Sequence, residues 1–314
     1  MRSRESLIAQ ASGGEELPAA RIRYSRKYAE ALARMFALTT GEQSAWDVCA
    51  AREAARDVIA ECNGHYTAWL VRLQCALQQR TREAALEELC LAAEVADSNT
   101  KCYQLWNHRQ QVASALLSDD LSELLSLELA FTESALHSDS KHFHAWSHRI
   151  WARRLSRSWK SELTFIDSLL ADDPFNNSAW NARFAAVTEG DDLRSCFQRE
   201  LNVVSRCIHQ NPDNEAAWNY ARAICSDRHG LPRDEHLEHL ARALLPCRLA
   251  LRTLGAVLSQ RKAIASLREA CQIYDYLATF DGSKSNFWTF KRRVAEQALT
   301  NLLHSIYQDS FEPL

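Results

Sequence analysis

The chain has 314 residues, with 37 Lys and Arg against 40 Asp and Glu, so its net charge at pH 7 is −3. This balance argues against nucleic-acid binding through bulk positive charge. No apolar run reaches the 18 or so residues needed to span a bilayer. With only 8 Gly and 6 Pro among many Leu, Ala, Glu and Arg residues, the composition predicts an all-helical protein.

The composition of the first part of the chain predicts a polar tail followed by helices. Residues 1–20 are polar, contain Gly13-Gly14 and lack an apolar stretch typical of a secretory signal, so we predict a disordered N-terminal tail. Residues 21–314 are predicted to form a single α-helical repeat domain. Within it, residues 22–61 form a leading hairpin, and the ten cysteines, which contain no C-x-x-C pair, are expected to be free thiols in the cytoplasm.

A short phrase with a central tryptophan recurs along the rest of the chain. Its first five copies are spaced by 37, 40, 34 and 38 residues, and a sixth follows after 70. A period near 35 residues is typical of repeat architectures. Because residues that recur so often cannot be specific to one active site, we interpret them as packing residues: Trp69, Trp106, Trp146, Trp180, Trp218, Trp288, and the arginines three residues after the first four, Arg72, Arg109, Arg149 and Arg183.

Each interval between phrases contains one amphipathic helix and then a polar link. Apolar residues keep helical spacing over 84–95, 121–136, 163–170 and 201–208. The phrase then opens a second helix, with Asn177 or Ser178 and Asn214 as candidate N-caps. The unit is therefore a helical hairpin, and we predict a solenoid of about six to seven hairpins. Residues 230–283 lack the phrase but still have helical periodicity.

The phrase differs from the tetratricopeptide repeat, in which Leu-Gly follows the tryptophan. It resembles the Asn-Tyr-x-x-Trp-x-x-Arg repeat of protein prenyltransferase α subunits, from about Ile22 to Gly230. The segments 144–151, 176–183 and 214–220 are most similar to the α subunit shared by farnesyltransferase and type I geranylgeranyltransferase. The resemblance implies a right-handed superhelical solenoid that wraps a β subunit in an obligate heterodimer.

The same resemblance implies an activity. The heterodimer would transfer an isoprenoid from farnesyl or geranylgeranyl diphosphate to the cysteine of a C-terminal CaaX sequence, on substrates such as small GTPases. The catalytic zinc, with magnesium as a second candidate ion, would belong to the β subunit. We expect no metal or other cofactor in this chain, and no activity without its partner.

Lys141 is the sharpest candidate for a chemical role. It precedes the third phrase at the predicted start of a helix, and in the family the lysine at this position reaches the diphosphate leaving group. The next two residues depart from the family pattern, because His142 replaces the usual Asn and Phe143 the usual Tyr. His142 could donate to a phosphate oxygen when protonated, or it could cap the helix or face solvent. Lys101 has the same register before the second phrase, yet no matching role is expected for it.

Three further residues match family positions near the active site. Tyr103 and His144 match positions beside the C-terminal residue of the bound peptide, with simple packing as the alternative. Asn176 matches a position at the active-site rim, with helix capping as the alternative. His108 and His148 recur two residues after a tryptophan, so we expect them to form hydrogen bonds between hairpins rather than to bind metal.

Two other functions stay open at this point. A helical-repeat scaffold that binds a protein partner without catalysis would share the hairpins, although it has no reason to keep a cation at Lys141. The α subunit of a Rab-type geranylgeranyltransferase would share the repeat but use a different β subunit. Farnesyl or geranylgeranyl preference, and the number of β subunits that share this chain, cannot be read from these residues.

Overall fold

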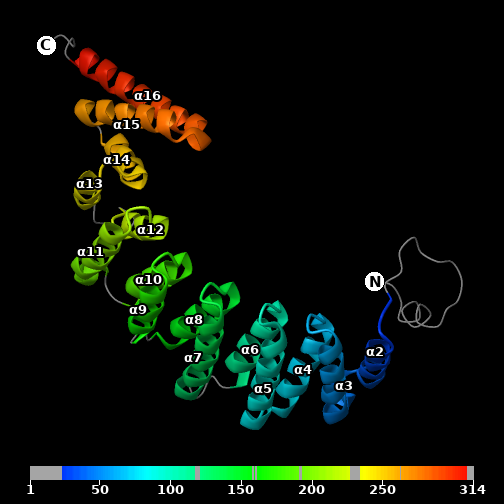
Figure 1. Ribbon diagram of the computed structural model, residues 1–314. Helices are drawn as coiled ribbons and strands as arrows, with labels where there is room; N and C mark the ends of the chain where they lie inside the picture. The colour runs from blue at the N-terminus through cyan, green and yellow to red at the C-terminus, as the bar shows by residue number, and fades with distance from the viewer. Residues whose placement is uncertain are drawn as a thin grey trace, which may run out of the picture. The chain divides into compact units, whose positions relative to one another are not determined.

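The computed structural model describes residues 23–116, 121–157, 159, 161–190, 193–226, 234–261 and 263–309. Every regular element in these ranges is a helix, and none of them is a strand (Figure 1). The all-α prediction is therefore confirmed. None of the described helices is long and apolar enough to cross a membrane. The tail predicted at 1–20 lies outside the described residues.

The chain divides into two compact units, residues 1–157 and 158–314. The first unit contains α2 (Arg26–Leu38), the short η1 (Gln43–Ala45), α3 (Val48–Glu61), α4 (Tyr66–Gln79), α5 (Arg82–Asn99), α6 (Tyr103–Leu116), α7 (Leu121–Ser138) and α8 (Phe143–Ser156). The second contains α9 (Glu162–Asp172), α10 (Asn177–Glu189), α11 (Leu193–Gln210), α12 (Glu215–Ile224), α13 (Asp234–Ala243), α14 (Arg248–Gln260), α15 (Ile264–Phe280), the short η3 (Gly282–Lys284) and α16 (Ser285–Asp309).

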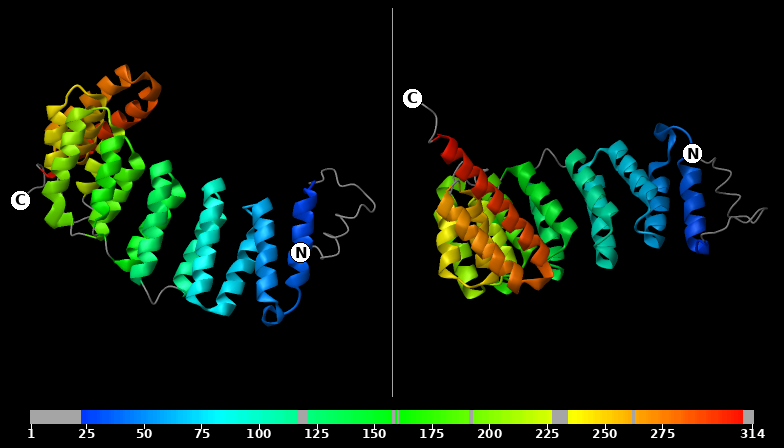
Figure 2. Two further views of the ribbon diagram at one scale, coloured as in Figure 1. Left: turned by 60° about the horizontal axis from the view of Figure 1, so that its bottom comes forward. Right: turned by 90° about the horizontal axis from the view of Figure 1, so that it is seen from above.

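Consecutive helices pack as hairpins in both units. In the first, α3 pairs with α4, α5 with α6 and α7 with α8, so α3 belongs to the first hairpin with the phrase, and α2 packs on α3 ahead of it. The second helices α4, α6 and α8 also contact one another in sequence, so the hairpins of this unit lie side by side (Figure 2). In the second unit the pairs are α9/α10, α11/α12, α13/α14 and α15/α16. The described residues thus form seven hairpins, at the upper end of the predicted number.

Each unit has its own apolar core. In the first, Leu73, Leu89, Val112 and Leu124 pack between helices α4 to α7. In the second, a larger cluster runs from Trp180 to Ala295. It includes α13 to α15, which cover most of the 230–283 stretch that lacks the phrase, so the helices predicted there are confirmed.

The tryptophan of each phrase fastens the link that precedes its helix. In the first five copies the indole Nε1–H donates to the carbonyl six residues earlier, at 2.6 to 2.9 Å. The sixth indole, of Trp288, donates instead to the Asp281 carboxylate at 2.9 Å. All six rings are at most 6% exposed. The tryptophan therefore satisfies a link carbonyl while it fills the space between helices.

A buried carboxylate joins neighbouring hairpins at three places. Glu128 accepts hydrogen bonds from Arg109 Nη2 at 2.8 Å and from His148 Nε2 at 2.6 Å. Each cluster contains the arginine of one phrase and a glutamate from the first helix of the next hairpin. Its third member is a histidine or tyrosine two residues after the tryptophan of that next hairpin. The three clusters are Arg72–Glu88–His108, Arg109–Glu128–His148 and Arg183–Glu200–Tyr220.

These clusters show the hydrogen bonds between hairpins that were predicted for His108 and His148. All nine side chains are at most 4% exposed. A buried ion pair is costly to desolvate, so it is most sensitive to the loss of one partner. Each carboxylate therefore fixes how one hairpin sits on the next.

A second bond crosses between hairpins at the start of the second helix. The Asn214 side chain donates from Nδ2 to the Pro174 carbonyl at 2.7 Å, the same carbonyl that Trp180 binds. Cys102 and Cys247 make the equivalent Sγ contacts to the Asn63 and Pro212 carbonyls, at 3.2 and 3.3 Å. These contacts give several of the cysteines a packing role, and all ten are free thiols, as predicted.

Replacing Glu128 by Gln should destabilise the fold strongly. The substitution keeps the side-chain shape but leaves the buried Arg109 guanidinium without a counter-charge, at a cost of about 3–5 kcal/mol. We expect the thermal midpoint, followed by circular dichroism, to fall by at least roughly 5 °C. Glu133→Gln on the same helix is the matched control, because Glu133 is 48% exposed and pairs only weakly with His137. Equal midpoints for the two variants would contradict the role of the cluster.

The clusters also predict how stability depends on acid. Burial raises the pKa of Glu128, but hydrogen bonds from His148 and the charge of Arg109 outweigh it, so the pKa lies below the ordinary value of 4.5. Glu88 and Glu200 are shifted downward in the same way. A depressed pKa contributes stability that is present above the unfolded-state pKa and is lost as pH falls through the folded-state pKa. The urea concentration at the unfolding midpoint should therefore decrease as the pH is lowered below about 4.5. The decrease with pH should be less steep in Glu128→Gln than in the unmodified protein.

Candidate functional site

The predicted site begins in the link between α7 and α8. The Asp139 carbonyl accepts the His142 N–H at 3.0 Å, and the Asp139 carboxylate accepts the backbone N–H of Lys141 at 3.1 Å. This turn sets Lys141 immediately before the N-cap of α8. The lysine side chain is exposed there, beside the end of a helix where backbone N–H groups and the helix dipole favour an anion.

Lys101 reaches the same turn from the preceding hairpin. Its ammonium lies 3.7 Å from the Asp139 carboxylate, and its side chain is 76% exposed. The two lysines thus share an equivalent position in successive repeats. Both contact the Asp139 carboxylate, Lys101 with its ammonium and Lys141 with its backbone N–H. The bond from the Lys141 backbone to Asp139 and the pairing of Asp139 with Lys101 are seen only in the structure.

His142 caps α8 and does not face solvent. Its Nδ1 accepts the Ala145 N–H at 3.2 Å, and the side chain is 3% exposed against the Trp106 ring. Since Nδ1 is the acceptor, the proton of the neutral ring is on Nε2, which has no hydrogen-bond partner among the described residues. Burial lowers its pKa from 6.5, the charges of His144 and Lys101 lower it further, and Asp139 opposes them. The protonated form needed for a cationic phosphate contact is therefore disfavoured.

Phe143, His144 and Tyr103 form a row of rings beside this turn. Phe143 is 73% exposed and meets the His144 ring edge-on, with centroids 5.4 Å apart. The His144 ring lies 6.1 Å from that of Tyr103, which is 55% exposed at the start of α6. The structure thus brings Lys141, Phe143, His144 and Tyr103 together in the first unit, with three aromatic side chains open to a ligand.

Asn176 lies in the second unit and caps α10. Its Oδ1 accepts the N–H groups of Ser178 and Ala179 at 3.0 and 3.1 Å, and the residue is fully buried. Of the two roles considered for Asn176, helix capping is the one that the structure shows, whereas Asn177 and Ser178, the residues predicted as caps, lie one and two residues past it. Asn214 is the N-cap of α12, as predicted. The link Asp173-Pro174 explains the shift, because the Asp173 carbonyl accepts the Asn176 N–H at 3.1 Å and closes the turn there.

Replacing His142 by Asn should stabilise the protein. At the equivalent place, Asn214 caps its helix with Oδ1 and also donates from Nδ2 to a link carbonyl of the preceding hairpin. An asparagine at 142 can do both, with the Thr100 carbonyl as its acceptor, and removes a buried polar atom without a partner. We expect a gain of about 1 kcal/mol in urea unfolding. His65→Asn, at a half-buried cap, should change stability less, and a loss of stability in His142→Asn would contradict this interpretation.

Four segments of the chain match the family described as protein prenyltransferase alpha subunit repeat. They are residues 85–116, 125–154, 159–189 and 197–227. Each segment covers most of one hairpin, from α5/α6 to α11/α12, and includes one tryptophan phrase. The family therefore matches the same units that the tryptophan spacing predicted.

Several relatives match most of the chain. It is 29% identical over 289 residues to the protein farnesyltransferase/geranylgeranyltransferase type-1 subunit alpha of Candida albicans, which covers 88% of this chain and 92% of the relative. The same subunit of Dictyostelium discoideum is 27% identical over 70% of this chain and 82% of its own length. The human geranylgeranyl transferase type-2 subunit alpha is 27% identical, but the match covers 50% of this chain and 29% of that protein.

A solved structure has the same fold. A chain of the Candida albicans protein geranylgeranyltransferase-I complexed with GGPP superposes with a TM-score of 0.73 at 27% identity, over 90% of this chain and 95% of that one. The likeness confirms the predicted solenoid of hairpins. The match to the Candida albicans type-1 subunit extends over nearly the full length of both chains, whereas the human type-2 match covers only part of each. Four hairpins of the chain therefore match the protein prenyltransferase alpha subunit repeat, and the chain is similar to a type-1 α subunit over most of its length.

Proposed function

We propose that this chain is the α subunit of a heterodimeric CaaX protein prenyltransferase, of the farnesyltransferase or type I geranylgeranyltransferase kind. The observation that carries the proposal is the near-complete match, in sequence and in fold, to type-1 α subunits. The complex transfers an isoprenoid from its diphosphate to the thiol of a C-terminal cysteine. The ten free cysteines of this chain suit a reducing compartment, so we place the complex in the cytoplasm.

The chain does not offer a zinc site of its own in the part that the structure describes. No three His, Cys, Asp or Glu side chains there lie close enough together to hold a metal ion. We therefore assign the zinc of the family, and any magnesium, to the β subunit or to the assembled site. The contribution of this chain is a rigid helical surface and a cation, and it has no activity without its partner.

Lys141 is proposed to act on the leaving group. In the transfer, a bond forms between the cysteine sulfur and C1 of the isoprenoid, and the bond from C1 to the diphosphate oxygen breaks with its electron pair. Negative charge therefore grows on the diphosphate. An exposed ammonium next to the start of α8 suits that charge, and the turn made by Asp139 holds its backbone in place before the reaction.

The ring cluster is proposed to lie beside the peptide. Tyr103 and His144 carry a hydroxyl and an imidazole within one partly exposed row, and both groups can donate to the terminal carboxylate of a CaaX sequence. Phe143 has no hydroxyl, so it can supply only an apolar wall. Asn176, with its oxygen engaged in the cap of α10, is proposed as a rim residue that shapes the backbone rather than one that binds the isoprenoid.

Lys141→Ala should slow the chemical step in the heterodimer. The loss of one charge from the leaving-group site is expected to lower the single-turnover rate roughly 10- to 100-fold, which corresponds to about 1.4–2.7 kcal/mol. Assembly should be intact, because the side chain is exposed. Lys101→Ala is the matched control, since this lysine has the same register one hairpin earlier and is also exposed. It should change the rate less than twofold, and equal effects of the two variants would contradict a specific role for Lys141.

Co-expression tests the assignment as a whole. The chain should form a stable complex with a type-1 β subunit and prenylate a CaaX peptide with farnesyl or geranylgeranyl diphosphate, while the chain alone should have no activity. Complex formation without activity towards either diphosphate would favour the scaffold. Activity only on substrates with paired terminal cysteines would favour the Rab-type subunit. A chain that is stable and monomeric alone would contradict the obligate heterodimer.

A further inference from the structure

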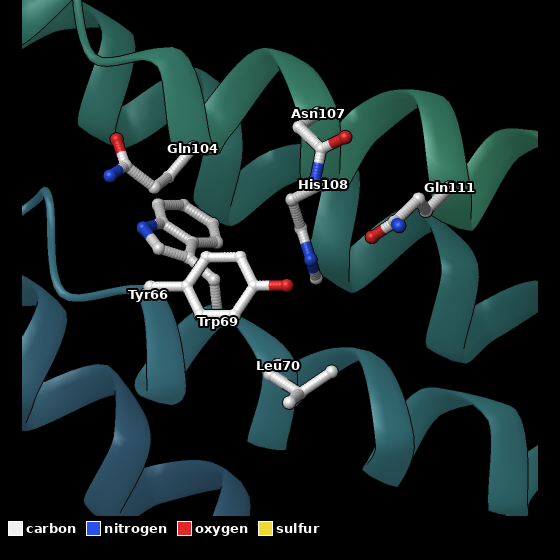
Figure 3. Close-up of a pocket in the computed structure, with 7 residues that line it drawn as sticks. All are labelled: Tyr66, Trp69, Leu70, Gln104, Asn107, His108 and Gln111. Atoms are coloured by element: carbon white, nitrogen blue, oxygen red, sulfur yellow. The ribbon is translucent and has the colours of Figure 1, made fainter.

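A small notch lies between the second helices of two hairpins in the first unit (Figure 3). Its enclosed volume is about 10 Å³, which is room for about one water molecule. The lining residues come from α4 and from α6, and none of them is an Asp, Glu, Lys or Arg. They are Tyr66, Trp69, Leu70, Gln104, Asn107, His108 and Gln111.

The floor of the notch contains an unsatisfied acceptor. His108 is 1% exposed, and its Nε2 lies 3.0 Å from the Glu88 carboxylate, which Arg72 holds at 2.7 Å. Because a carboxylate only accepts, Nε2 carries the proton, and Nδ1 of the neutral ring is an acceptor. This Nδ1 is buried and has no hydrogen-bond partner among the described residues. A buried acceptor without a donor is costly, so the notch favours a ligand that brings one N–H or O–H group.

The rim of the notch offers further free polar groups. The carboxamides of Asn107 and Gln111 form no hydrogen bond within the described part of the chain, whereas Gln104 donates to the Gly64 carbonyl at 3.0 Å. Four residues of helix separate Asn107 and Gln111 by about 6 Å along α6. In an extended chain, groups on one side recur every 6.6 Å or so. Two carboxamides at this spacing, each with a donor and an acceptor, match an extended main chain.

Exposed aromatic rings stand at the starts of the second helices of this unit, one of them on the rim of the notch. Tyr66, on its rim, is 62% exposed at the first residue of α4. Tyr103 and Phe143 hold the same register at the starts of α6 and α8 and are 55% and 73% exposed. Exposed tyrosine and phenylalanine side chains are typical of protein interfaces.

We infer that this notch is a docking point for an extended segment of the β subunit. The main chain of the segment pairs with the carboxamides of Asn107 and Gln111, and a serine or threonine hydroxyl enters the notch and donates to His108 Nδ1. The hydroxyl is the water-sized donor that the volume admits. This inference rests on the proposed function for the identity of the partner. It makes the surface between α4 and α6 a part of the subunit interface that is separate from the diphosphate site.

The test is the dissociation of the purified heterodimer of full-length chains. The double variant Asn107→Leu/Gln111→Leu keeps side-chain size and helix propensity but removes both carboxamides. We expect its dissociation constant, measured by mass photometry on dilution, to rise roughly 10- to 100-fold. Tyr66→Phe is a milder second variant. Gln110→Leu is the matched control, because Gln110 is exposed on the same helix but does not line the notch, and it should leave the dissociation constant unchanged.

The outcomes separate this inference from the proposed function. If the unmodified chain assembles and the double variant dissociates like Gln110→Leu, the notch holds solvent only and the inference is overturned, while the heterodimer stands. If the unmodified chain binds no β subunit, the proposed function fails and the inference fails with it. Weaker assembly of the double variant, with an unchanged circular dichroism spectrum and thermal midpoint, supports docking at the notch.

Discussion

A buried glutamate at the junction of successive hairpins determines where the second helices lie. Glu88, Glu128 and Glu200 each hold the arginine of one phrase and a ring of the next. Removing one partner would leave a charge in the core, so the junction tolerates little displacement. The tryptophan then fastens the preceding link to the same helix. Together these contacts fix the start of each second helix, and the start of α8 is where Lys141 stands.

Functional differences between hairpins lie at the positions that this framework leaves open. The tryptophans and arginines do the same work in several copies and are buried. The residues just before and at the start of the second helix vary, since they include an exposed lysine, a capping histidine or asparagine and an exposed ring. Lys101 and Lys141 show how small the difference is, because both approach Asp139 and only the second precedes α8. One repeat can therefore provide structure in most copies and chemistry in one.

The sequence predicted the hairpins because tryptophan spacing and helical periodicity are strong local signals. It did not predict the buried glutamates, which follow their arginines by 16, 19 and 17 residues. This spacing varies with the length of the links, so no fixed motif reveals it. Capping by Asn176 was only the alternative to a role at the site, and the turn closed by Asp173 places the helix start there rather than at Asn177 or Ser178. The diphosphate role of Lys141 came from family resemblance, since Lys101 has the same local sequence signal, and the unpaired nitrogens of His108 and His142 required the side-chain contacts.

The central claim is that the start of α8 lies at the diphosphate of the bound isoprenoid. Photoaffinity labelling of the assembled heterodimer, with an analogue that carries its photoreactive group on the terminal phosphate, tests this most directly. Mass spectrometry should locate the label in the peptide that contains Lys141 to His144, and excess unlabelled diphosphate should compete for it. A label confined to the β subunit, or one on this chain at the Lys101 segment alone, would contradict the account.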